Sequence, residues 1–200
     1  MTTVDEWNER FSRGSSVCPT PDPFFARLDP CYSLLPGWRI SDDKQPGRGL
    51  RALDLACGSG RHAVNLARRG FHTTAIDFSL QALIFAQKFA TQKNVIVDYR
   101  SEDVEKKNFR LSQRSYDLVA VFFFLHRPLF PALRDCLRTG GLIIYKTYCC
   151  EYPPASGRAF NPIHTLEPNE LLRIFVGFRV LRYEEEWEGK GTAALIAQKI

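Results

Sequence analysis

One stretch decides the fold of this chain: Leu53-Asp54-Leu55-Ala56-Cys57-Gly58-Ser59-Gly60-Arg61. Residues 50–57 form an apolar run typical of a buried strand, and residues 61–69 have the periodicity of an amphipathic helix. Gly58 and Gly60 therefore fall in the turn between strand and helix, where they let the backbone approach a ligand closely. The first N–H groups of the helix are free to bind the same ligand. The pattern therefore predicts a glycine-rich turn that binds a ligand through its backbone.

The next strand ends in an acidic residue that suits such a ligand. Asp77 closes the apolar run 71–77, after the turn at Gly58. A carboxylate at this strand end can accept hydrogen bonds from both hydroxyls of a ribose. The turn and the carboxylate together predict a cofactor that contains a nucleoside. The alternative is a purely structural turn followed by an unrelated aspartate.

Asp54 narrows the choice of cofactor. The pattern Gly58-x-Gly60-x-x-Ala63 also fits the fingerprint of dinucleotide-binding proteins. However, Asp54 is a charged residue inside an apolar strand, and burying a carboxylate is costly unless something compensates for its charge. It would repel the pyrophosphate of a dinucleotide but favour the ammonium of a cofactor that carries an amino acid. S-adenosylmethionine supplies both an ammonium and a ribose.

The rest of the chain alternates between strand and helix patterns, which predicts a doubly wound α/β sheet. Further strands are expected at 94–99, 116–123, 142–147, 178–184 and 192–198, and helices at 79–91, 128–137 and 168–175. Gly140-Gly141 is expected to separate the helix at 128–137 from the strand that follows. Ligands of such sheets bind at the carboxyl ends of the strands.

These residues also carry a family resemblance. Asp54 to Gly60 and Asp77-Phe78-Ser79 resemble motifs I and II of the class I S-adenosylmethionine-dependent methyltransferases, and Ser101-Glu102-Asp103-Val104 resembles motif III. Tyr116-Asp117-Leu118-Val119 and residues 137–142 resemble the motifs that open the fourth and fifth strands. The resemblance implies a Rossmann-like, seven-stranded sheet in three α/β/α layers, with strands 1–5 parallel and a C-terminal antiparallel hairpin.

The resemblance also implies a set of cofactor-binding residues. They are Trp7, Arg10, Asp54, Cys57, Gly58, Ser59, Gly60, Asp77, Phe78, Ser79, Glu102, Asp103, Val104 and Phe122. Residues 1–48 differ in pattern from the rest of the chain, so the expected division is an N-terminal arm, residues 1–48, and a methyltransferase domain, residues 49–200. The arm contains six prolines and a predicted helix at 4–12, which we expect to fold over the cofactor as a lid.

A narrower resemblance points to the TehB-like (tellurite-resistance) subgroup of these methyltransferases. It rests on Trp7-Asn-Glu-Arg10-Phe11, on Leu55-Ala-Cys-Gly-Ser-Gly-Arg-His62 and on His126-Arg127-Pro128. The chain departs from the general pattern at Ala56, where many members have glycine, and the small alanine is expected to be tolerated. The connection 104–115 is short, so we expect a single helical turn there or none.

Residues on the acceptor side follow the fourth and fifth strands. His126 can accept a proton from the nucleophile and Arg127 can hold an anionic acceptor, so this pair is the predicted catalytic site. Alternatively, His126 caps the next helix and Arg127 forms a surface ion pair. The adjacent thiols of Cys149 and Cys150 could bind a soft metalloid, or they are two ordinary cysteines.

Composition and missing motifs set limits on the function. The 200 residues suit one domain, and the net charge of +5 comes from scattered basic residues that do not favour nucleic acid. The longest uncharged apolar run, 118–125, is too short for a membrane span, and an acidic, polar N-terminus favours a cytoplasmic protein. The six cysteines form no C-x-x-C pair, so no metal is expected.

We therefore predict an S-adenosylmethionine-dependent methyltransferase with a small-molecule acceptor. No Asn-Pro-Pro-Tyr run follows the fourth strand, which disfavours the nucleic-acid and protein amino-methyltransferases that use such a run. No Tyr-x-x-x-Lys motif occurs, which disfavours a short-chain dehydrogenase. The alternatives are an NAD(P)-dependent oxidoreductase and a non-catalytic protein that binds S-adenosylmethionine. The identity of the acceptor, a metalloid such as tellurite included, and the oligomeric state stay open.

Overall fold

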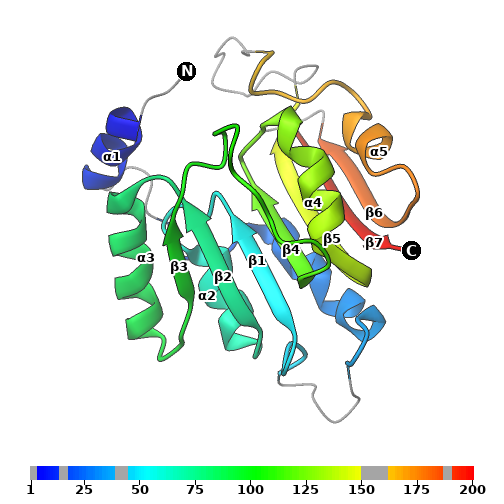
Figure 1. Ribbon diagram of the computed structural model, residues 1–200, viewed down its shortest axis with the longest axis horizontal. Helices are drawn as coiled ribbons and strands as arrows, with labels where there is room; N and C mark the ends of the chain where they lie inside the picture. The colour runs from blue at the N-terminus through cyan, green and yellow to red at the C-terminus, as the bar shows by residue number, and fades with distance from the viewer. Residues whose placement is uncertain (1–3, 14–17, 39–44, 150–161, 187–190) are drawn as a thin grey trace. The chain divides into compact units, whose positions relative to one another are not determined.

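The computed structural model of this chain describes residues 4–13, 18–38, 45–149, 162–186 and 191–200 (Figure 1). The chain divides into two compact units, residues 1–110 and 111–200, which are described one after the other. The division into an arm, 1–48, and a domain, 49–200, stays a prediction. Within the described ranges, no helix is long and apolar enough to cross a membrane.

The first unit is built on three parallel strands in the order β3-β2-β1. They are β1 (Arg51–Leu55), β2 (His72–Asp77) and β3 (Asp98–Ser101). Two helices connect and cover them, α2 (Arg61–Arg68) and α3 (Leu80–Gln92) (Figure 1). Ser79 begins α3 because its hydroxyl accepts the N–H of Ala82 at 3.1 Å. The carboxyl ends of β1 and β2 thus lead directly into the two helix N-termini.

The proline-rich arm of this unit forms two helical segments. The first, α1 (Val4–Ser12), has the bounds expected from the sequence, and the second, η1 (Pro23–Leu34), is a 3-10 helix. Phe25 of η1 stacks on His62 of α2 with ring centroids 5.2 Å apart. The Nε2 atom of His62 accepts the N–H of Asp22 at 3.1 Å. His62 is therefore a buried anchor that holds the arm on α2.

The described residues of the second unit contain four strands in the order β4-β5-β7-β6. They are β4 (Tyr116–Phe122), β5 (Leu137–Tyr148), β6 (Phe178–Glu186) and β7 (Thr192–Lys199). β4 and β5 are parallel, whereas β7 is antiparallel to both β5 and β6, so the expected C-terminal hairpin is confirmed. In the part of this unit that the structure describes, the helices are η3 (Arg127–Leu129), α4 (Phe130–Cys136) and α5 (Glu170–Ile174) (Figure 1).

Two expected strand positions are wrong. The third strand covers Asp98–Ser101 instead of 94–99, and Ile96 in the preceding turn is 93% exposed. β3 ends the strand order of its unit, and an edge strand does not need the apolar run Val95-Ile96-Val97 that suggested it. The fifth strand begins at Leu137, directly after α4, so Gly140-Gly141 lies inside the strand and does not precede it. The connection 102–115 contains turns but no helix, as expected.

Candidate functional site

The turn after β1 has an unusual backbone. Ala56, Gly58 and Gly60 all have positive φ angles, of 55°, 53° and 78°. The N–H of Cys57 donates to the carbonyl of Ile76 at 3.0 Å, and the N–H of Gly60 donates to the carbonyl of Cys57, also at 3.0 Å. The first bond joins the turn to β2 and the second closes the turn itself, so the N-terminus of α2 has a defined position at the carboxyl edge of the strands.

The two glycines of the turn serve different purposes. A Cβ atom on Gly60 would lie 2.7 Å from Cβ of Ala86 and 3.2 Å from the hydroxyl of Tyr99, so Gly60 allows α3 to pack closely on the turn. A Cβ atom on Gly58 would meet only the ring of Phe11, at 3.4 Å. Gly58 is therefore the position at which Phe11 of α1 packs against the turn.

Asp77 lies against this turn. One of its carboxylate oxygens accepts the N–H of Gly58 at 2.8 Å, and the other accepts the N–H of Ser79 at 2.9 Å. The side chain is buried, and burial raises its pKa, although the hydrogen bonds from Ser79, Gly58 and Phe78 oppose the shift. The strand-end carboxylate and the glycine turn are thus joined by a direct hydrogen bond.

Asp54 lies beneath the same turn and is almost completely buried. One carboxylate oxygen accepts the N–H of Ala63, in the first turn of α2, at 2.8 Å. Burial raises the pKa of Asp54 to about 7, against the opposing effects of the Ala63 hydrogen bond and the Arg61 charge. This carboxyl group therefore changes its charge near neutral pH, and a nearby cation would favour the charged form.

The remaining predicted residues of the first unit surround this pair. Cys57 and Ser59 are buried in the turn, and burial raises the pKa of the Cys57 thiol. The N–H of Glu102 donates to the carbonyl of Asp77 at 3.1 Å, which brings the segment after β3 to the same edge. The carboxylate of Asp103 accepts the N–H of Glu105 at 3.0 Å and so shapes this segment. Val104 is buried and Glu102 is exposed.

α1 packs over the turn, through residues that the sequence prediction only partly included. Trp7 stacks on Phe11 with centroids 6.0 Å apart, and Phe11 is buried against Gly58. Asn8 was not predicted as a site residue, yet its side-chain oxygen accepts the hydroxyl of Ser79 at 2.6 Å. Its position inside the Trp7–Phe11 motif was the available signal. The backbone of Arg10 belongs to α1, but its side chain lies outside the described residues.

In the second unit, aromatic residues end β4. Phe122 is buried, and the next residue, Phe123, has a positive φ of 57°. The ring centroids of Phe122 and Phe123 are 6.5 Å apart, and those of Phe123 and Tyr148 are 5.3 Å apart. A left-handed conformation is strained for a residue with a bulky side chain. The end of β4 therefore has a fixed, strained backbone next to the predicted acceptor residues.

His126 and Arg127 have different surroundings. His126 precedes η3 at the N-cap position, but its side chain makes no capping hydrogen bond. Arg127 binds Glu170 through two hydrogen bonds, of 2.7 and 2.8 Å, and also donates to the carbonyls of Thr165 and Pro162 at 2.9 and 3.3 Å. The guanidinium thus holds the segment that leads into α5. Glu170 was missed as its partner because nothing local in the sequence links residues so far apart.

The predicted thiol pair is only half described. Cys149 is completely buried and its N–H donates to the carbonyl of Gly191 at 2.8 Å, whereas Cys150 lies outside the described residues. The first unit thus brings Asp54, Cys57, Gly58, Ser59, Gly60, Asp77, Ser79 and the segment after β3 to one strand edge. The second unit holds Phe122, His126 and Arg127 after β4.

Comparison with known proteins shows that the chain is similar to methyltransferases. Residues 52–141 match a family model described as a methyltransferase domain. Over 144 residues the chain is 29% identical to a ubiquinone biosynthesis O-methyltransferase from Bordetella pertussis, covering 70% of this chain and 59% of the relative. It is 26% identical to TehB from Haemophilus influenzae over 144 residues, covering 68% of this chain and 48% of TehB.

Solved structures extend this likeness to the fold. An S-adenosylmethionine-dependent methyltransferase from Mesorhizobium loti superimposes with a TM-score of 0.62 at 19% identity, covering 85% of this chain and 96% of the other. The expected fold class, a Rossmann-like seven-stranded sheet that ends in an antiparallel hairpin, is confirmed. The chain spans about half the length of the curated relatives it matches.

Proposed function

Because this chain belongs to the class I S-adenosylmethionine-dependent methyltransferases and has TehB-like relatives, we propose that it transfers a methyl group from S-adenosylmethionine to a small-molecule acceptor. One observation carries the proposal: the Gly58 N–H is bound to the Asp77 carboxylate while Asp54 is buried beneath the same turn. A small acceptor is supported by the name of the relative from Bordetella pertussis, an O-methyltransferase of ubiquinone biosynthesis.

The residues at this turn suit the ribose of the cofactor. Asp77 uses one position on each carboxylate oxygen for the backbone N–H groups of Gly58 and Ser79. The N–H of Phe78 also interacts with this carboxylate, and an ionised carboxylate offers about four acceptor positions, so at least one stays available for a ribose hydroxyl. The backbone bonds hold the carboxylate in place before the cofactor binds, which reduces the entropy that binding costs.

Asp54 suits the ammonium of the cofactor. Its pKa of about 7 shows that the buried charge is poorly compensated in the free protein. An ammonium near the turn would stabilise the ionised form, acting through the N-terminus of α2 that Asp54 binds at Ala63. A pyrophosphate at the same place would have the opposite effect, which argues against a dinucleotide.

The mechanism requires positioning more than acid–base chemistry. When bound, the cofactor supplies a methyl group that its sulfonium already activates for transfer. The protein's task is to align the nucleophile behind that methyl group and to keep water out, and alignment alone can contribute roughly 7–11 kcal/mol. Phe11 of α1, on which Trp7 stacks, packs against Gly58 and so shields the turn from water. We propose that His126 takes up the proton of the nucleophilic atom of the methyl acceptor, where that atom carries one.

Calorimetry with S-adenosylmethionine and NADH tests the cofactor. We expect saturable binding of S-adenosylmethionine only, and an affinity about 10-fold weaker or more for Asp77→Ala, because a hydrogen bond to a charged group contributes ~1.5–3 kcal/mol. Asp98→Ala is the matched control, since Asp98 forms an exposed ion pair with Arg100 and accepts the hydroxyl of Thr74 at 3.4 Å, and neither contact involves the glycine turn. Binding of NADH, or unchanged affinity in folded Asp77→Ala, would contradict the assignment.

Transfer of a labelled methyl group to a panel of acceptors tests catalysis. The panel should contain phenols, carboxylates, thiols and oxyanions of tellurium and selenium. Transfer to at least one of them is expected, with His126→Ala lowering kcat by ~100-fold while cofactor affinity is kept. Tight cofactor binding without transfer to any acceptor would favour the non-catalytic alternative.

A further inference from the structure

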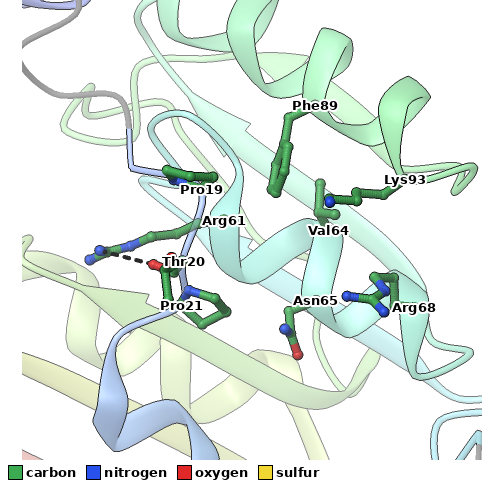
Figure 2. Close-up of a pocket in the computed structure, with 9 residues that line it drawn as sticks. All are labelled: Pro19, Thr20, Pro21, Arg61, Val64, Asn65, Arg68, Phe89 and Lys93. Atoms are coloured by element: carbon green, nitrogen blue, oxygen red, sulfur yellow. Dashed lines mark hydrogen bonds between the residues drawn. The ribbon is translucent and has the colours of Figure 1, made fainter.

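The first unit contains a cavity on the side of α2 that the cofactor assignment does not use (Figure 2). It has a volume of about 170 Å³ and lies between the segment 18–22, α2 and the C-terminal part of α3. Its lining consists of Pro19, Thr20, Pro21, Arg61, Val64, Asn65, Arg68, Phe89 and Lys93. All of these residues belong to one compact unit, so the cavity is defined within that unit alone.

The spacing of the α2 residues explains why they meet here. Arg61, Val64, Asn65 and Arg68 lie at positions i, i+3, i+4 and i+7, which form one face of a helix. Lys93 follows the last residue of α3 and reaches the same space from the other side (Figure 2). Three cationic side chains, Arg61 and Arg68 of α2 and Lys93 after α3, thus line a single cavity, and its nine lining residues include no carboxylate. Arg61 donates to the carbonyl of Thr20 at 3.5 Å.

The basic residues of this cavity differ from the neighbouring Arg69 in their carboxylate partners. Arg69 forms an ion pair with Asp29 at 2.9 Å. Arg68 and Lys93, by contrast, have no carboxylate within 4.0 Å among the residues that the structure describes. The ammonium of Lys93 lies 5.7 Å from the centre of the Phe89 ring, a contact that holds it at the rim of the cavity. Arg68 and Lys93 therefore carry positive charge here with no carboxylate partner among the described residues.

We propose that this cavity is a binding site for a small molecule that carries a phosphate group. The guanidinium of Arg68 can bind two phosphate oxygens at once, and Lys93 supplies a second positive charge beside it. Pro19, Pro21 and Phe89 form apolar walls that suit the uncharged part of a phosphate ester. The proposal goes beyond the methyltransferase activity and does not depend on it.

The shape of the site favours a small ligand over a nucleic acid. A duplex or a single strand is bound by a stripe of cations that follows the backbone over several phosphates. Here the cations face a cavity of about 170 Å³ that is closed on one side by the chain segment Pro19–Pro21. Sites that enclose drug-sized ligands measure about 300–1,000 Å³, so inorganic phosphate or a short phosphomonoester is the expected size.

Phosphorus NMR and calorimetry on the full chain test the proposal, with inorganic phosphate, glycerol 3-phosphate and glycerol as probes. We expect saturable binding of at least one phosphate probe, none of glycerol, and at least a 10-fold loss of affinity in the double variant Arg68→Gln/Lys93→Gln. The matched control is Lys88→Gln/Lys106→Gln, which removes the same charge from exposed positions outside the cavity and should bind within twofold of the wild type.

The outcome distinguishes a specific binding site from non-specific electrostatic attraction. Sodium chloride at equal ionic strength should not reproduce the saturable response, because screening has no fixed stoichiometry. Equal loss of affinity in the two double variants, or a response that sodium chloride reproduces, would overturn the proposal. A wild-type chain that ignores both phosphate probes but binds a 12-nucleotide RNA would also overturn it. Circular dichroism of both variants confirms that they are folded.

Discussion

At the residue scale, Ala56 is held in a conformation that favours glycine. Its φ of 55° lies in the left-handed region, which costs an L-residue ~1–2 kcal/mol. Replacing it by glycine removes that strain. It also increases the conformational entropy of the unfolded chain, which lowers the free energy of unfolding by ~0.4–1 kcal/mol. Ala56→Gly should therefore raise the free energy of unfolding in urea by about 0.5–1 kcal/mol. Ala56→Val should lower it, and a loss of stability on changing to glycine would contradict the argument.

Asp54 makes stability depend on pH in a specific direction. Its pKa is raised from 3.8 to about 7, so the folded protein binds a proton that the unfolded chain has released. The resulting stabilisation is complete below pH 3.8 and is lost as the pH rises through about 7. It amounts to ~4 kcal/mol at most, because one pKa unit corresponds to ~1.36 kcal/mol.

Asp54→Asn isolates this effect, because asparagine keeps an oxygen for the Ala63 N–H and carries no charge. Urea unfolding at pH 4 and pH 8 should show that the variant, relative to the wild type, gains stability as the pH rises. S-adenosylmethionine should reverse the trend in the wild type and release protons on binding near pH 6.5, because its ammonium favours the ionised carboxyl group. The same relative stability at both pH values would exclude Asp54 as the titrating group.

At the element scale, α1 is attached to the cofactor turn by a small number of contacts. Asn8→Ala removes the acceptor of the Ser79 hydroxyl and should weaken S-adenosylmethionine binding about three- to tenfold, since such a bond contributes ~1 kcal/mol. Deleting residues 1–14 should have a larger effect and slow turnover. Glu9→Ala is the control, because the exposed Glu9–Arg13 pair contributes little. Full affinity in the truncated chain would mean that α1 is not a lid.

Arg127 and Glu170 allow a structural role to be separated from acceptor binding. If the pair only holds the segment before α5, Arg127→Ala and Glu170→Gln should each destabilise the protein, by ~1.5–3 kcal/mol, and change KM equally. If Arg127 also binds an anionic acceptor, only Arg127→Ala should raise KM for that acceptor. Thermal unfolding and steady-state kinetics of both variants decide between the two roles.

The sequence predicted most elements because their patterns are local. The turn at Gly58, the cap at Ser79 and the helix at 4–12 follow from neighbouring residues alone. The third strand was misplaced because an edge strand carries little burial signal. The contact of Gly60 with Ala86, and the pairing of Arg127 with Glu170, depend on packing between distant segments, which no local pattern contains.

At the scale of the whole molecule, cofactor binding should be visible as a change in thermal stability. A ligand at 100 times its Kd stabilises the folded state by ~2.7 kcal/mol, which corresponds to about 5–10 °C in a chain of this size. Differential scanning fluorimetry with S-adenosylmethionine should show this shift, and the same concentration of NADH should show none. Asp77→Ala should lose most of the shift. A shift with NADH alone would favour the oxidoreductase alternative.

The distribution of cysteines provides a natural position for a spectroscopic label. Cys57, Cys136 and Cys149 are buried, and burial raises the pKa of the Cys136 thiol to about 12. Because the thiolate is the species that reacts, we expect these three buried thiols to react little with maleimide reagents. Cys18 is exposed and directly precedes Pro19, which lines the basic cavity beside α2. A fluorophore on Cys18 would report a ligand entering that cavity without modifying a thiol of the cofactor turn.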